Sequence, residues 1–143
     1  MKGVLTNIEQ ETKANKKFRK IMYTGAHLQL VKMSLKPGED IGDEVHKDTD
    51  QFLRVEAGSG TIKIDGVEHS FNSGDAALIP AGTEHNVTNT GKEDLKLYTL
   101  YGPPHHKDGL VQDTKSDPDE EFDGVTTESR VSKKGVLKKV LKG

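Results

Sequence analysis

The sequence predicts an all-β protein, folded as an antiparallel sandwich or barrel. Between residues 22 and 102, short apolar or alternating runs are separated by Gly, Asp, Asn and Pro, and no stretch repeats apolar residues at helical spacing. Asp65-Gly66, between two of these runs, is a strong signal for a two-residue hairpin turn. Many short strands at such close spacing are typical of sandwiches and closed barrels.

The individual strands follow from where each apolar or alternating run begins and ends. The N-terminal piece adds two expected edge strands, at residues 4–8 and 19–23, on either side of a Lys-rich loop. The strands predicted after it span residues 27–35, 51–57, 61–65, 67–71, 76–79, 85–89 and 95–101.

Length and composition limit the classes of protein to consider. A chain of 143 residues makes one domain, and a net charge of -2 gives no reason to expect a nucleic-acid partner. Because the sequence has no cysteine, any metal must be held by nitrogen and oxygen ligands. No long apolar run follows the N-terminus, so we expect no membrane contact and a cytoplasmic protein.

The chain changes character after residue 102, which predicts a barrel over residues 1–112 and an extension over residues 113–143 that is partly disordered. Residues 113–123 carry six acidic side chains against one lysine, and residues 129–143 carry six Lys or Arg and no acid. We expect both runs to form a solvated tail, since neither buries much apolar surface. The alternative is a short basic helix, weakened by Gly135, with one apolar face formed by Val131, Val136, Leu137, Val140 and Leu141.

One motif places a histidine at a fixed depth in the sheet. Residues 74–89 fit the pattern G-x5-P-x-G-x2-H-x3-N without a mismatch. Gly74 permits a turn, a short strand follows, and Pro80 with Gly82 enforces a tight reversal that delivers His85 onto the next strand.

A second pattern lies upstream, from Gly38 to Gly58, and reads G-x5-E-x-H-x4-Q-x6-G. Glu44 and His46 are two residues apart, so on a strand they face the same side. Gln51 lies five residues beyond His46, which is the wrong parity for one straight strand. The chain between them must therefore turn or bulge if Gln51 also points inward.

Together the two patterns resemble the paired motifs of the cupin superfamily, in order and in separation. The first cupin motif is G-x5-H-x-H-x3,4-E-x6-G, so Glu44 stands here for its first histidine and Gln51 for its glutamate. The chain looks most like small single-domain bacterial cupins of the mannose-6-phosphate isomerase-like kind. The resemblance implies a jelly-roll barrel, a homodimer, and one divalent transition metal (Mn, Fe, Zn or Ni) on Glu44, His46, Gln51 and His85.

The two substitutions leave alternatives for the site. In the first, Glu44 does not bind the metal and acts as a general base, with its pKa raised by a barrel wall of Leu53 and Val55. In the second, no metal binds, and the polar residues hydrogen-bond one another. Relative to the usual motif, Glu44 adds one carboxylate and Gln51 removes one, so the total charge of the ligand set is unchanged. This compensation favours a working metal site.

The remaining histidines are weaker candidates. His27 and His69 lie in predicted strands and are expected to be surface or hydrogen-bonded residues. His105 and His106 could fold over the barrel mouth as a lid or a substrate contact, or could lie in an ordinary exposed loop.

The resemblance does not fix a reaction, because one fold serves many activities. Our leading expectation is a metal-dependent, redox-neutral enzyme of the isomerase, epimerase or lyase type, acting on a small sugar-like or hydroxy-carbonyl substrate, with Glu44 as the catalytic residue that moves a proton. An iron-dependent dioxygenase is the first alternative. A non-catalytic cupin that binds a small molecule is the second.

Overall fold

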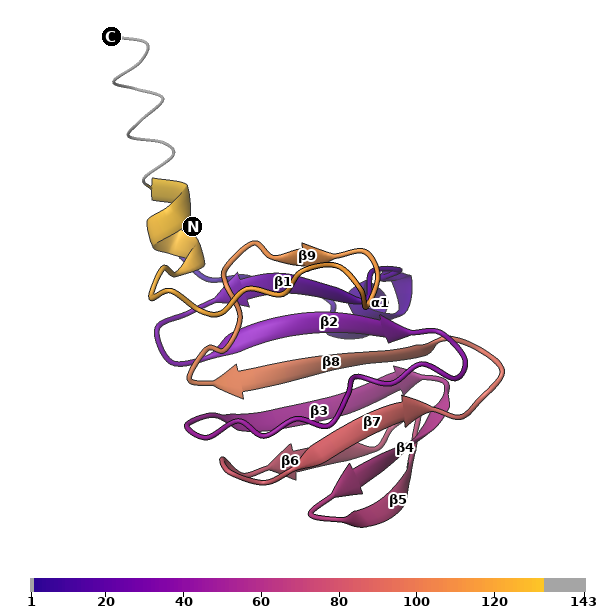
Figure 1. Cartoon of the computed structure of the whole chain (residues 1–143). Helices are drawn as coiled ribbons and strands as arrows, with labels where there is room; N and C mark the ends of the chain where they lie inside the picture. Colours follow the sequence, from indigo (N-terminus) through magenta and orange to yellow (C-terminus); the bar gives the residue numbers. More distant parts are fainter. Residues whose placement is uncertain (1, 133–143) are drawn as a thin grey trace, which may run out of the picture.

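A computed structural model describes residues 2–132 and confirms the predicted all-β jelly roll. Two antiparallel sheets make up the barrel (Figure 1), with strand orders β6-β3-β8-β2-β1-β9 and β5-β4-β7. The elements are α1 (Ile8–Ala14), β1 (Arg19–Thr24), β2 (Gln29–Leu35), β3 (Asp50–Ala57), β4 (Ser59–Ile64), β5 (Val67–Asn72), β6 (Ala76–Ile79), β7 (His85–Asn89), β8 (Leu95–Gly102) and β9 (Val111–Gln112).

The barrel interior changes from apolar to polar along β8. Side chains of this strand alternate between buried and half-buried, as expected for a strand with one face in the core. Leu95 and Leu97 lie fully buried in the apolar part, whereas Thr99 and Tyr101, farther along the same face, are buried polar residues. The polar end is therefore the part of the interior that needs hydrogen-bond partners or a ligand.

The chain between β2 and β3 lies beside β7, at the edge of the three-stranded sheet. Isolated bridges pair Asp40 with Thr88 and Glu44 with His85, so this connection runs antiparallel to β7. Ile41, which is 7% exposed, packs into the core between the two bridges. This pairing carries Glu44 to the polar end of the barrel.

The N-terminal prediction is half right. Residues 19–23 form β1 as expected, but residues 4–8 do not form a strand, and the helix α1 begins at Ile8. Asn7 caps this helix, because its Oδ1 accepts a hydrogen bond from the Gln10 backbone N–H at 3.0 Å. The apolar residues Val4 and Ile8 suggested a strand. However, the cap at Asn7 and the three good helix formers that follow Ile8 determine the local structure.

The segment after β8 does not leave the barrel as a free tail. The backbone N–H groups of Lys107 and Phe122 donate to the carbonyls of Glu120 and His105, so residues 119–122 lie beside residues 105–107. Most side chains of residues 113–123 are exposed, as expected, but their backbone is docked. This corrects the expectation of a solvated acidic tail.

Farther on, Arg130 Nε donates to the buried Asp108 carboxylate at 2.6 Å, and residues 127–132 are helical. Of the alternative basic helix, only its start at Val131 is described. The basic residues 133–143 lie outside the described residues, and the boundary at residue 112 stays a prediction. No helix within residues 2–132 has both the length and the apolar character needed to cross a membrane, and the cytoplasmic location also stays a prediction.

Candidate metal centre

The Pro80-to-Thr83 turn is fastened to the upstream motif. Gly82 has a φ of 85°, a conformation that side chains disfavour, and its N–H donates to the His46 carbonyl at 2.8 Å. Ala81 N–H donates to Asp50 Oδ1 at 2.8 Å. Two backbone contacts therefore hold the segment before His85 against the segment that carries His46.

Glu44 and His85 are themselves a paired bridge. Each backbone N–H donates to the carbonyl of the other, at 2.9 Å and 3.0 Å. His46 follows two residues later on the same face, with its Nε2 3.1 Å from Glu44 Oε2. One ligand atom from each of Glu44, His46 and His85 lies within 4.8 Å of the others. The spacing in the sequence has thus brought one carboxylate and two imidazoles together.

Gln51 joins this cluster from β3, as the motif predicted. The chain bends at Lys47 and Asp48, and the Gln51 side chain is 1% exposed. Its Nε2 donates to Thr99 Oγ1 at 2.9 Å, and its Oε1 lies 2.9 Å from His85 Nε2. The bend supplies the change of parity that a straight strand could not.

The contact between His85 and Gln51 tests whether a metal fits. His85 Nδ1 lies 3.0 Å from the Thr83 carbonyl, so that nitrogen carries the proton and Nε2 presents a lone pair. Gln51 Oε1 is also an acceptor, so two lone pairs face each other. Metal–ligand bonds of about 2.1 Å place neighbouring ligand atoms roughly 3 Å apart, which suits this pair and the Glu44–His46 pair.

The opposite amide orientation of Gln51 describes the metal-free alternative. In that orientation, its amide N–H would donate to His85 Nε2, and its oxygen would accept from the Thr99 hydroxyl. The two amide orientations differ in whether they need a metal ion. Only the first one requires a cation between the two side chains.

Glu44 is ionised, contrary to the expectation of a raised pKa. Burial of the carboxylate raises its pKa, but the hydrogen bond with His46 and the charge of Arg19 together outweigh burial and hold the pKa below its usual value. Leu53 and Val55 are fully buried, as expected, yet they do not dominate the environment of Glu44. A low pKa suits a metal ligand better than a general base.

Arg19 is a site residue that the sequence analysis missed. It points inward from β1, is 4% exposed, and places Nη2 3.7 Å from Glu44 Oε1 and Nη1 3.8 Å from Asp119 Oδ2. The only hydrogen bond of its side chain within residues 2–132 goes to Gln112 Oε1, and its Nε has no partner there. In the sequence, the one indication that Arg19 points inward is its alternation with the exposed Lys20. Nothing in the spacing connects residue 19 with residue 44.

His105 and His106 both lie near the cluster. The ring centroid of His105 is 4.2 Å from that of His46, and burial, together with the charges of His106 and His46, lowers the pKa of His105 to about 4. His106 Nδ1 donates to Asp119 Oδ1 at 2.9 Å, while its Nε2 accepts from the Tyr101 hydroxyl at 3.3 Å. Burial lowers the pKa of His106 although Asp119 opposes the shift, and burial raises the pKa of Tyr101.

The other two histidines lie elsewhere. His27 precedes β2 in a bend, and His69 lies on β5, and both are exposed. Neither contributes to the Glu44–His46–His85 cluster, in agreement with their interpretation as surface residues.

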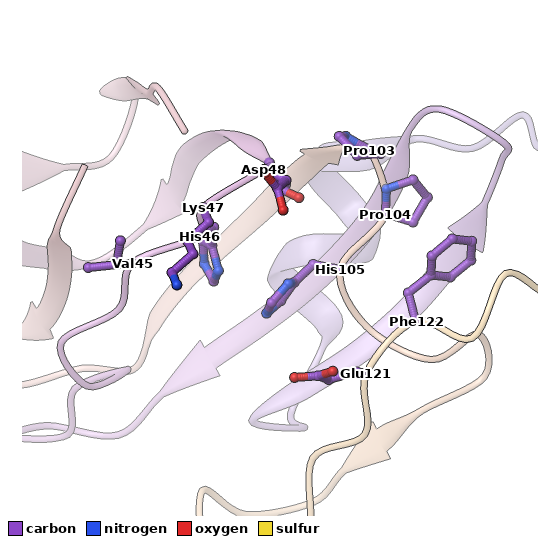
Figure 2. Close-up of a pocket in the computed structure, with 10 residues that line it drawn as sticks. Val45, His46, Lys47, Asp48, Pro103, Pro104, His105, Glu121 and Phe122 are labelled. Carbon is purple, nitrogen blue, oxygen red and sulfur yellow. The ribbon is translucent and has the colours of Figure 1, made fainter. Parts of the chain in front are cut away.

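A cavity of about 310 Å³ opens beside His46. One wall is the bend after His46, and the other comes from residues 103–105 and 121–122 (Figure 2). Figure 2 shows His105 between His46 and the Phe122 end of the cavity. A small molecule in this space would lie next to His46, one of the candidate metal ligands.

Comparisons with known proteins agree with the fold. A family model described as "Cupin domain" matches residues 31–101. The chain is similar to the crystal structure of BH2720 from Bacillus halodurans, with a TM-score of 0.78 and 48% identity, covering 79% of this chain and 90% of that one.

Two curated relatives are similar over most of the chain. Protein YrkC of Bacillus subtilis strain 168 is 46% identical, covering 81% of this chain and 66% of YrkC. Protein L612 of Acanthamoeba polyphaga mimivirus is 43% identical, covering 75% of this chain and 69% of L612. About a third of each relative therefore lies outside the aligned part.

Proposed function

Because this chain belongs to the cupin superfamily, we propose that it binds one divalent transition metal and catalyses a redox-neutral reaction on a small sugar-like or hydroxy-carbonyl substrate. The reaction would be of the isomerase, epimerase or lyase type. Glu44, His46 and His85, with Gln51, would hold the metal. Manganese, iron, zinc and nickel all suit this donor set.

The observation that carries the proposal is the convergence of Glu44, His46 and His85 within 4.8 Å at the polar end of an otherwise apolar barrel. In the observed amide orientation, Gln51 Oε1 and His85 Nε2 face each other as two acceptors, and a cation would satisfy both. The set also carries the same charge as the usual three-histidine, one-glutamate set. When bound, the metal would supply a Lewis acid that polarises a substrate carbonyl.

The surrounding residues prepare the donor set. Arg19 stabilises the ionised form of Glu44, so the carboxylate is ready to bind a cation near neutral pH. His85 is held in one tautomer by its hydrogen bond to Thr83, which directs Nε2 toward the cluster. His105 lies beside His46, and its pKa of about 4 keeps it uncharged at neutral pH, so it can hydrogen-bond a substrate without adding positive charge beside the donor set.

An iron-dependent dioxygenase is the second candidate. Glu44, His46 and His85 are two histidines and one carboxylate, which is the donor set of many non-haem iron oxygenases. We favour redox-neutral chemistry because Gln51 would add a fourth, neutral oxygen donor, so the donor set differs from that of such an oxygenase.

Deuterium exchange separates these activities. Protein loaded with Mn, Fe, Zn or Ni is incubated under nitrogen in D₂O with D-mannose, D-fructose and D-glucuronate, and His85→Ala is the control. Loss of the proton signal next to the carbonyl supports redox-neutral proton transfer. In a parallel incubation under air, oxygen uptake with the iron form alone supports the dioxygenase. Metal binding without either activity supports a non-catalytic small-molecule-binding cupin.

A further inference from the structure

The cavity beside His46 has its outer wall in the part of the chain that the family model does not cover. The matched residues 31–101 include all four candidate metal ligands, whereas Pro103, Pro104, His105, Glu121 and Phe122 follow them. The backbone hydrogen bond from Phe122 to His105, at 3.0 Å, ties the two pieces of this wall together. The features that select a ligand can therefore differ here from those of other cupins.

His105 is held in place without a polar partner. Its backbone N–H donates to Gln29 Oε1 at 3.2 Å, and its ring packs against those of His46, Tyr101 and His106. Within residues 2–132, its two ring nitrogens make no hydrogen bond, although the residue is half-buried. An imidazole offers one donor and one acceptor, and neither His105 ring nitrogen is a buried unpaired atom, so both are open to a molecule in the cavity.

The rest of the rim offers both donors and acceptors. Lys47, Asp48 and Glu121 line the cavity, and within the described part of the chain none of their charged groups forms an ion pair. Two carboxylates and one ammonium leave the rim slightly negative. Such a rim disfavours a phosphorylated ligand and suits several hydroxyl groups.

Apart from Thr49, the remaining lining is apolar. Pro103, Pro104 and the half-buried Phe122 form one end of the cavity, and Figure 2 shows Phe122 beside Pro104. Sugars combine a polar rim of hydroxyls with apolar C–H faces, which pack on rings of this kind. A volume of about 310 Å³ is at the lower end of the range for ligand sites, about 300–1,000 Å³, and so suits a molecule of monosaccharide size.

We propose that this cavity binds a small neutral polyhydroxy carbonyl compound, with His105 hydrogen-bonding its oxygen atoms and Phe122 packing on its C–H face. The inference rests on the proposed function, because a ligand in this cavity would lie beside the proposed metal centre. It goes further in naming the residues that select the ligand and in excluding sugar phosphates.

The test uses the full-length, ¹⁵N-labelled protein loaded with zinc. D-Mannose, D-fructose, D-xylose and dihydroxyacetone are titrated in turn, and D-mannose 6-phosphate is the anionic comparison. We expect at least one neutral compound to shift the amide signals of His105 and Phe122, and the phosphate to bind at least tenfold more weakly than D-mannose. His105→Ala and Phe122→Ala should each weaken binding at least tenfold, while His69→Ala, an exposed histidine on β5, should change it less than twofold.

Zinc stoichiometry on the same samples keeps the two proposals separate. Bound zinc with no shifts from any of the four neutral compounds would overturn the inference and leave the metal centre standing. Shifts at His105 and Phe122 without bound zinc would uphold the cavity and exclude zinc as the metal of the proposed centre. If His105→Ala also loses zinc, Phe122→Ala and Glu121→Gln decide, since within residues 2–132 neither side chain forms a hydrogen bond or ion pair with a candidate ligand. Binding unchanged in both of these variants, or tighter binding of D-mannose 6-phosphate, would contradict the proposal.

Discussion

His85 Nε2 lies 2.9 Å from Gln51 Oε1, although the Thr83 carbonyl already takes the proton of the opposite ring nitrogen. In this amide orientation of Gln51 two acceptors face each other, and a cation between them would remove their repulsion. The pair joins β7 of one sheet to β3 of the other, so the site connects the two layers of the jelly roll. Side chains from both sheets would therefore hold the proposed metal.

Replacing Gln51 by Glu tests this relationship. The change adds a second carboxylate to the donor set, so we expect metal to bind more tightly, by tenfold or more. The additional negative charge should also reduce the Lewis acidity of the centre and lower turnover. Competition with a metal-sensitive dye measures the affinity. An unchanged affinity would show that Gln51 does not bind the metal and only hydrogen-bonds to Thr99 and His85.

Replacing Glu44 by Gln distinguishes a ligand from a general base. Because the pKa of Glu44 is held low by His46 and Arg19, we expect the carboxylate to be a ligand and its loss to weaken metal binding at least tenfold. Metal content and D₂O exchange are measured on the same sample. Full metal content with lost exchange would instead assign Glu44 as the base.

The sequence was most informative where local spacing determines geometry. Glu44 and His46 share a face because they are two residues apart, and the Pro-x-Gly reversal places His85 opposite them. Arg19 and Asp119 could not be found this way, because their approach to the site depends on the pairing of β1 with β2 and β9 and on the docking of residues 119–122. Long-range packing of this kind leaves no short-range pattern.

Asp108 makes acid stability depend on the C-terminal segment. Burial alone would raise the pKa of Asp108, but hydrogen bonds from Arg130 and Thr127 hold it below its usual value. A lowered folded-state pKa contributes stability above the unfolded value, about 3.9, and that stability is lost as the pH falls through the lower folded value. We expect Asp108→Asn to be less stable than the wild type at pH 6, and the difference to shrink below about pH 4. Urea unfolding at several pH values measures it, and a constant difference would contradict the assignment.

Two truncations test the same contact. A chain that ends at Glu128 loses Arg130 and leaves the Asp108 carboxylate, whose side chain is 3% exposed, with Thr127 as its remaining side-chain partner on this segment. A chain that ends at Ser132 keeps Arg130. We expect the shorter chain to melt a few degrees lower, since roughly 1 kcal/mol corresponds to a few degrees for a domain of this size. Equal melting temperatures would mean that the ion pair contributes little.

The central claim is that Glu44, His46, Gln51 and His85 hold one metal, and elemental analysis tests it most directly. Purified wild-type protein and His85→Ala are reconstituted with manganese, iron, zinc and nickel in turn, and circular dichroism checks that the sheets stay folded. We predict close to one metal per wild-type chain for at least one of the four metals, and almost none in the folded variant. A wild-type protein that retains none of the four would contradict the site and favour the metal-free hydrogen-bond network.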